Sequence, residues 1–199
     1  MRYAAFRTLE TQRLMLRALS REDIPAYYAR LGSSEDVTRY MLFQPHRDIS
    51  ESVASIEKAI CRYETGKCYR WAIALKESNE LIGILEPLRF DEEKDTCSFA
   101  YMLGKDFWGR GYATEALKAV FHFLFTEMGI QRVEADHMAA NPASGAVMRK
   151  CGMVFQGIRE KAYEKNGIKQ DAILYAITRE QWTNPEQKDR KIPLSRLFS

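Results

Sequence analysis

The most constraining feature of this chain is a pair of glycines, Gly109 and Gly111, placed directly before a strongly patterned helix. After Ala113, apolar residues recur at spacings of three and four as far as Met128, and Gly129 then follows as a helix terminator. The first turn of such a helix has free backbone N–H donors and the positive end of the helix dipole. Because glycine has no Cβ, an anion can approach this backbone closely. The segment therefore predicts a binding site for a phosphorylated cofactor.

A second helix start of the same kind lies one predicted strand further along. Asn141 is a favourable N-cap, Pro142 occupies the first helical position, and Gly152 follows the helix end. This pattern predicts a short helix from about residue 142 to 150, with Ser144 in its first turn. Capping alone explains each of these residues, but two phosphate-type helix starts separated by one strand favour a functional role.

The hydrophobic pattern predicts a mixed α/β sheet without an internal repeat. In chain order we expect a strand at 14–19, helices from 21 and at 50–63, strands at 69–75, 81–90 and 96–103, a helix at 113–128, a strand at 131–136, a helix at 142–150, and strands at 154–163 and 171–178. Asn166 and Gly167 mark the turn between the last two strands. A single domain is predicted over residues 1–182, followed by a C-terminal tail at 183–199.

Length and charge narrow the class of protein. The 199 residues, 46% of them hydrophobic, suffice for one buried core. The net charge is +3 and the charges are interspersed, so neither nucleic acid nor a membrane surface is an expected partner. No export signal or membrane-length apolar run is found, which predicts a cytoplasmic protein. Reduced thiols and no metal site are expected, because no C-x-x-C pair or metal-ligand spacing occurs among Cys61, Cys68, Cys97, Cys151 and the three histidines.

Two motifs carry a resemblance to a known superfamily. Residues 108–113, Trp-Gly-Arg-Gly-Tyr-Ala, resemble the Q/R-x-x-G-x-G/A motif of GNAT N-acetyltransferases, and residues 141–153 resemble their N-x-x-A/S-x-x-x-x-x-K-x-G-F motif. The resemblance extends from about Leu14 to Trp182, and it is similar in detail to the branch of Rim-type ribosomal-protein N-terminal acetyltransferases. It implies the GNAT acyl-CoA N-acyltransferase fold, a mixed, mostly antiparallel sheet with a splayed strand pair and flanking helices. The implied reaction is acetyl transfer from acetyl-CoA to a primary amine.

The resemblance also implies roles for individual residues. The pyrophosphate of coenzyme A would be held by the backbone amides of Gly109, Arg110, Gly111, Tyr112, Ala113 and Thr114. Trp108, at the first motif position, is a further candidate for cofactor binding. The amides of Met102 and Leu103, on a strand that splays near a bulge, would bind the pantetheine arm on one side and Asn141 on the other. Ser144 stands at the Rim-type position of the acid that protonates the leaving thiolate. Many relatives use a tyrosine as this acid, and Met148 stands at that tyrosine's position.

The glutamates that serve as the general base in related enzymes are not present at the matching positions of this chain. Ser98 and Tyr163 stand where related enzymes often have glutamates, and Glu86 and Glu160 are the candidate substitutes. We therefore expect proton removal through ordered water, with at most one of these carboxylates polarising it. The acceptor pocket is expected around the first two helices and their connection, where the candidates are Tyr27, Tyr28, Tyr40, Met41, Phe43 and Trp71.

Several alternatives stay open at this point. The acceptor could be a ribosomal-protein N-terminus, another peptide, a polyamine or an antibiotic amine, and a homodimer is a further open expectation. No cysteine adjoins a histidine in either motif, so direct attack in a ternary complex is expected. A CoA-binding regulator without catalysis is the main alternative. A dinucleotide-binding oxidoreductase is disfavoured, because Thr114 replaces the third glycine and the loop at 103–109 is too long.

Overall fold

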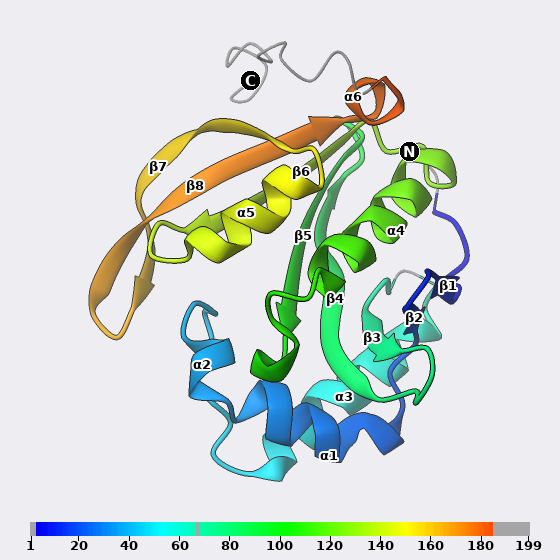
Figure 1. Cartoon of the computed structure of the whole chain (residues 1–199), viewed down its shortest axis with the longest axis vertical. Helices are drawn as coiled ribbons and strands as arrows, with labels where there is room; N and C mark the ends of the chain where they lie inside the picture. Colours follow the sequence, from blue (N-terminus) through cyan, green and yellow to red (C-terminus); the bar gives the residue numbers. More distant parts are fainter. Residues whose placement is uncertain (1–2, 67, 185–199) are drawn as a thin grey trace.

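The computed structural model describes residues 3–66 and 68–184, which form one central sheet with helices on its two faces (Figure 1). The described strands make an eight-stranded sheet in the order β1-β2-β3-β4-β5-β6-β8-β7. Their bounds are β1 (Leu9–Glu10), β2 (Leu14–Arg17), β3 (Trp71–Leu75), β4 (Leu81–Asp91), β5 (Thr96–Leu103), β6 (Arg132–Met138), β7 (Val154–Lys165) and β8 (Ile168–Thr178). Neighbouring strands are antiparallel except β5 and β6, which run parallel. The predicted fold class is confirmed.

The helices connect these strands in the predicted order. They are α1 (Ile24–Tyr27), α2 (Glu35–Thr38), α3 (Ile49–Tyr63), α4 (Tyr112–Thr126), α5 (Pro142–Lys150) and α6 (Arg179–Thr183). The helix predicted from Arg21 begins as a 3-10 turn after Ser20 and continues through α1 into a π-helical turn at Tyr28–Gly32. The pattern did not predict β1, α2 or α6, because elements of two to five residues are too short to show a hydrophobic period.

Each face of the sheet carries its own hydrophobic cluster. The cluster under α4 and α5 contains Cys97, Phe99 and Leu103 of β5, whereas Met102 of the same strand belongs to the cluster under α1 and α3. Successive side chains of a strand point to opposite faces, so the odd-numbered residues of β5 face α4 and the even-numbered ones face α1 and α3. This alternation determines which of the cavity residues on β5 face the same side of the sheet.

The parallel strands β5 and β6 separate after only three residue pairs, which are Thr96–Arg132, Cys97–Val133 and Ser98–Glu134. Beyond them, β5 stays paired with β4 as far as Leu103, and β6 stays paired with β8 as far as Met138. The two strands therefore diverge toward their ends (Figure 1), which confirms the predicted splayed pair. The expected bulge lies on β4, where Leu88 is the extra residue in the pairing with β5.

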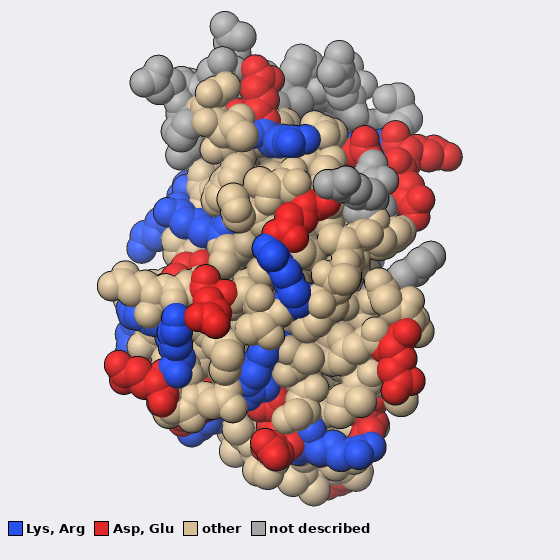
Figure 2. Space-filling view, turned by 90° about the vertical axis from the view of Figure 1, so that its right-hand side faces the viewer, with Lys and Arg blue, Asp and Glu red and all other residues tan. Residues whose placement is uncertain are grey.

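The predictions about the thiols, the surface charges, membrane spans and the C-terminal tail have separate outcomes. All four cysteines are free thiols, as predicted. Positive and negative side chains are interspersed on the face shown in Figure 2. Within residues 3–66 and 68–184, no helix is long and apolar enough to cross a membrane. The tail predicted at 183–199 lies, from residue 185 onward, outside the described residues, and the limits of the domain stay a prediction.

Candidate functional site

A cavity of about 540 Å³ lies where β5 and β6 diverge. Its walls come from the second halves of β5 and β6, the first turns of α4 and α5, and residues 36–42 around α2. The sequence-predicted residues in its lining are Met102, Leu103, Trp108, Gly109, Gly111, Tyr112, Ala113, Thr114, Asn141 and Ser144. Arg110 is not in the lining. The structure thus brings both motif segments to one cavity.

The loop before α4 has the backbone of an anion cradle. Gly109 and Gly111 have φ of 73° and 82°, in the left-handed region that favours glycine. Gly111 is the N-cap of α4 and offers no side-chain cap, so the first-turn N–H groups remain available to a ligand. A Cβ built on Gly109 meets nothing within 4 Å, which leaves this approach to the backbone open. The residues therefore fit a bound pyrophosphate.

Arg13 braces this loop from the β1–β2 side. Its Nη1 donates to the carbonyl of Arg110 at 3.0 Å, its Nε donates to Glu115 at 2.7 Å, and its guanidinium lies 4.4 Å from the ring centroid of Tyr112. Glu115 also accepts from the Thr11 hydroxyl at 2.6 Å. Burial opposes ionisation of Glu115, but these hydrogen bonds from Thr11 and Arg13 lower its pKa. Sequence reasoning missed this brace, because its two sides are far apart in the chain.

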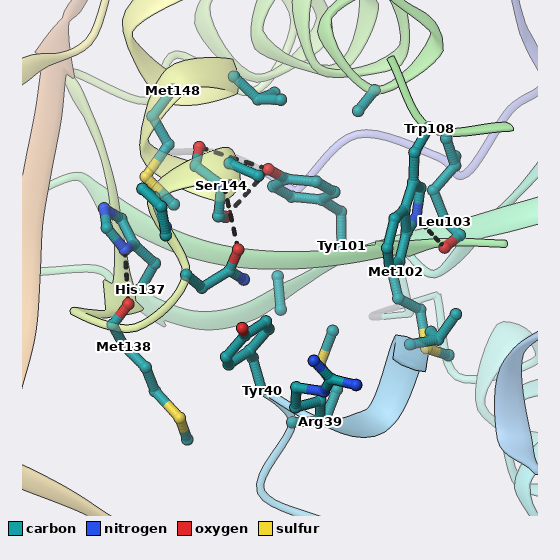
Figure 3. Close-up of a pocket in the computed structure, with 18 of the residues that line it drawn as sticks. Arg39, Tyr40, Tyr101, Met102, Leu103, Trp108, His137, Met138, Ser144 and Met148 are labelled. Carbon is teal, nitrogen blue, oxygen red and sulfur yellow. Dashed lines mark hydrogen bonds between the residues drawn. The ribbon is translucent and has the colours of Figure 1, made fainter. Parts of the chain in front are cut away.

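The free edge of β5 forms one wall of the cavity. The Gly104 amide donates to the Ile82 carbonyl on β4 at 2.8 Å, and Trp108 Nε1 donates to the Leu103 carbonyl at 2.7 Å (Figure 3). Because N–H and C=O groups alternate between the two edges of a strand, the Leu103 amide faces the gap and the Met102 amide faces β4. This alternation of backbone groups therefore favours the Leu103 amide over the Met102 amide as a donor to a ligand in the gap. Trp108 itself is about half exposed.

Two hydroxyl groups meet at the start of α5. The Asn141 side chain caps this helix by accepting from the Ser144 amide at 3.3 Å. The Ser144 hydroxyl lies 3.0 Å from the Tyr101 hydroxyl, as Figure 3 shows, and Met148 is buried on the same helix. Burial raises the pKa of Tyr101 to about 12, so this phenol keeps its proton at neutral pH. Sequence reasoning missed Tyr101, since only the tertiary structure places it beside α5.

Neither candidate carboxylate of the sequence analysis lies in the cavity lining. The Glu86 carboxylate is 3.5 Å from Arg70 Nε, and Glu160 is exposed. Residues 160–162 fall in a register shift of β7 against β8, after which the pairing resumes at Tyr163. Glu160 lies outside the cavity lining, whereas Tyr163 belongs to it. The cavity lining gives no support to a role for Glu86 or Glu160 beside the reacting groups, and that role stays a prediction.

Asp136 on β6 is a cavity carboxylate that was not among the predicted site residues. Its Oδ1 accepts a hydrogen bond from the Tyr163 hydroxyl, and its Oδ2 lies 3.3 Å from Arg159 Nη2. Burial and, secondarily, the bond to Asp136 raise the pKa of Tyr163. The pair joins β6 to β7, which are not adjacent in the sheet, so no local sequence pattern could have revealed it.

The candidate residues of the acceptor pocket divide between the core and the cavity. Tyr40 and Met41 line the cavity, whereas Tyr27 and Trp71 are buried in the core. The other two candidates, Tyr28 and Phe43, are not in the lining.

The tip of the β7–β8 hairpin holds the segment around α2 in place. Lys165 Nζ donates to three backbone carbonyls of this segment, those of Thr38 at 2.6 Å, Met41 at 2.7 Å and Phe43 at 3.0 Å. Burial lowers the pKa of Lys165. The hairpin therefore determines where Met41 and its neighbours lie against the cavity.

Comparisons with known proteins agree on a family. Residues 13–154 match the family model described as an acetyltransferase (GNAT) domain. The chain is 27% identical over 174 residues to the uncharacterized N-acetyltransferase YoaA of Bacillus subtilis, covering 87% of this chain and 98% of the relative. It is 25% identical over 186 residues to the ribosomal protein uS5-alanine N-acetyltransferase of Escherichia coli, covering 88% and 92%. Among solved structures, a spermidine N-acetyltransferase from Vibrio cholerae in complex with CoA and spermine has a TM-score of 0.75 at 21% identity, covering 87% and 100%.

Proposed function

Because the chain belongs to the acetyltransferase (GNAT) domain family and is an acetyl-CoA-dependent N-acetyltransferase, we propose that the cavity between β5 and β6 holds both substrates and that acetyl passes directly to a primary amine. One observation carries this proposal: the cavity is lined from both faces of the sheet. Tyr101 and Ser144 lie on the α4–α5 side, whereas Met102 and Tyr40 lie on the other side.

On the α4–α5 side, the backbone amides of residues 109–114 are the proposed binding site of the pyrophosphate. The left-handed glycines and the uncapped first turn of α4 support this assignment. The Leu103 amide and the Asn141 side chain are the proposed contacts of the pantetheine arm. Coenzyme A supplies the thioester that makes the acetyl group transferable. Arg13 maintains the cradle without entering the lining.

The reaction needs two hydrogen-bond donors from the protein. The Leu103 amide can stabilise the negative charge that develops on the thioester oxygen during attack. Ser144 can donate a proton to the departing sulfur, and Tyr101 is positioned to replace it. Among the described residues that line the cavity there is no cysteine, which supports direct transfer over an acyl-enzyme intermediate.

The proposed acceptors are peptide N-termini and small-molecule amines. The named relatives act on an alanine of a ribosomal protein and on spermidine, and both substrates offer a primary amine. Cytoplasmic location and homodimer formation stay predictions.

The deciding experiment measures thiol release from acetyl-CoA with a panel of amines and N-terminal peptides. We expect turnover with at least one member of the panel. Calorimetry should show binding of acetyl-CoA and none of nicotinamide dinucleotides. Binding of acetyl-CoA without turnover of any amine would instead favour the regulator that lacks catalysis.

A further inference from the structure

Asp136 occupies the point where β5 and β6 part. Glu134 is the last residue of β6 that pairs with β5, and Asp136 is the next residue on the same face of that strand. Its carboxylate therefore stands at the closed end of the gap, and it belongs to the cavity lining.

The direction of the Asp136 side chain follows from its neighbours. His137 is buried beneath α5, so close that a Cβ on Gly145 would lie 2.5 Å from His137 Nε2. Asp136 points to the opposite face because adjacent residues alternate. Met138 shares the face of Asp136, and Figure 3 shows its side chain on the side of Tyr40, away from Ser144. Asp136 therefore lies on the proposed acceptor side.

Of the residues that the structure describes, two with carboxylates, Asp36 and Asp136, line the cavity, and one of them is already neutralised. Asp36 makes ion pairs with Lys105 at 2.6 Å and with Arg39 at 3.0 Å, and the hydrogen bond from Lys105 lowers its pKa. Asp136 has one oxygen oriented by the Tyr163 hydroxyl. Among the described residues, its other oxygen contacts only Arg159, and that side chain is 57% exposed, so solvent screens the pair. A cationic amine can compete for this oxygen.

We propose that Asp136 binds the amine nitrogen of the acceptor and takes its proton during acetyl transfer. The proposal rests on the proposed function. An amine that binds as the cation first gives one proton to the Asp136 carboxylate, which releases it to water. The neutral amine then attacks, and as the N–C bond forms and the C–S bond breaks, the nitrogen loses a second proton to the same carboxylate, which again releases it to water. The departing sulfur gains a proton from Ser144, which regains one from water through Tyr101. Tyr163 is a positioning residue that fixes the carboxylate at the end of the gap.

The test compares Asp136→Asn with Glu134→Gln in the full chain, using the best amine of the panel. Glu134 is a matched control, because it is an ion-paired carboxylate on the same strand and face but lies outside the cavity lining. For Asp136→Asn we expect kcat/KM for the amine to fall about 100-fold or more, with the Kd of acetyl-CoA within about twofold of wild type. Glu134→Gln should stay within about twofold in both quantities.

The outcomes separate this inference from the proposed function. An Asp136→Asn variant that binds acetyl-CoA normally and keeps kcat/KM within about threefold overturns the role of Asp136. If circular dichroism shows that Asp136→Asn does not fold, Asp136→Ser is measured against the same limits. A wild-type protein that acetylates no amine contradicts the proposed function itself, before any variant is considered.

Discussion

The hydroxyl oxygen of Tyr101 lies 3.0 Å from that of Ser144 and so connects β5 with the first turn of α5 inside the cavity. Burial holds the pKa of Tyr101 at about 12, which keeps the phenol protonated through the neutral range. A proton given up by Ser144 can therefore be replaced from a group in direct contact with it. The two hydroxyls form a short relay beside the proposed position of the leaving sulfur.

Removal of the Ser144 hydroxyl should slow the chemical step. We expect Ser144→Ala to lower kcat about 100-fold and to leave the Kd of acetyl-CoA nearly unchanged, because only proton donation is lost. Tyr101→Phe should cost about tenfold, and the double variant should be no slower than Ser144→Ala, since both residues act in one relay. Steady-state kinetics and calorimetry measure these effects. A normal kcat with a lower melting temperature for Ser144→Ala would show a purely structural residue at the helix start.

A carboxylate in the cradle should weaken coenzyme binding. For Gly111→Asp we expect the Kd of acetyl-CoA to rise by several-fold to hundreds-fold, about 1–3 kcal/mol, because the new charge repels the pyrophosphate. Gly129→Asp is the matched control for backbone strain, since Gly129 has φ of 70° and lies beyond the other end of α4. Calorimetry on both folded variants decides the matter. Equal affinities of the two variants would falsify the cradle assignment.

The contacts of Lys165 should matter for the acceptor and not for coenzyme A. Lys165→Ala removes three hydrogen bonds that hold the segment around α2, so we expect the KM of the amine to rise about threefold to tenfold. The Kd of acetyl-CoA should not change. Lys169→Ala removes an exposed lysine of the same hairpin and serves as the control. If both variants show the same KM, the hairpin does not position the acceptor side.

The close packing of α5 on β6 predicts a loss of stability at Gly145. A Cβ there would overlap the buried His137 ring, so Gly145→Ala should lower the free energy of unfolding by about 1–3 kcal/mol. Denaturant unfolding gives this value. Adding His137→Ala should make the Gly145→Ala substitution less costly than it is in the wild-type background, because the clash is then relieved. Independent, additive effects of the two substitutions would argue against this contact.

The cradle shows how much of the site a local pattern can reveal. Gly109, Gly111 and the apolar period of α4 lie within one short segment, so spacing alone predicted a helix start able to bind an anion. The same holds for Asn141 and α5, whose capping chemistry is local. The helix α4 ends at Thr126, two residues before the predicted end, because the chain leaves the helix in a capping turn where the Glu127 and Met128 amides both donate to the Phe123 carbonyl.

The acceptor side shows where such reasoning ends. Glu160 and Tyr163 are three residues apart, and the pairing of β7 with β8 shifts by two residues between Arg159 and Tyr163. Tyr163 lines the cavity and Glu160 does not. Nothing in the β7 sequence shows where such an irregularity interrupts the strand, so the sequence alone does not tell which of these two residues reaches the cavity. The pairing of the strands therefore determines which carboxylates lie near the reacting groups.

The sequence by itself determined the longer helices and strands, the family and the two helix starts of the proposed coenzyme site, because helix periodicity, capping and turn chemistry act over a few residues. Only the tertiary structure decided the contents of the acceptor side. The divergence of β5 from β6 opens the gap, and the pairing of β6 with β8 and of β8 with β7 brings Tyr163 to Asp136. These contacts depend on strand register and on the pleat, which are properties of the assembled sheet rather than of any one segment.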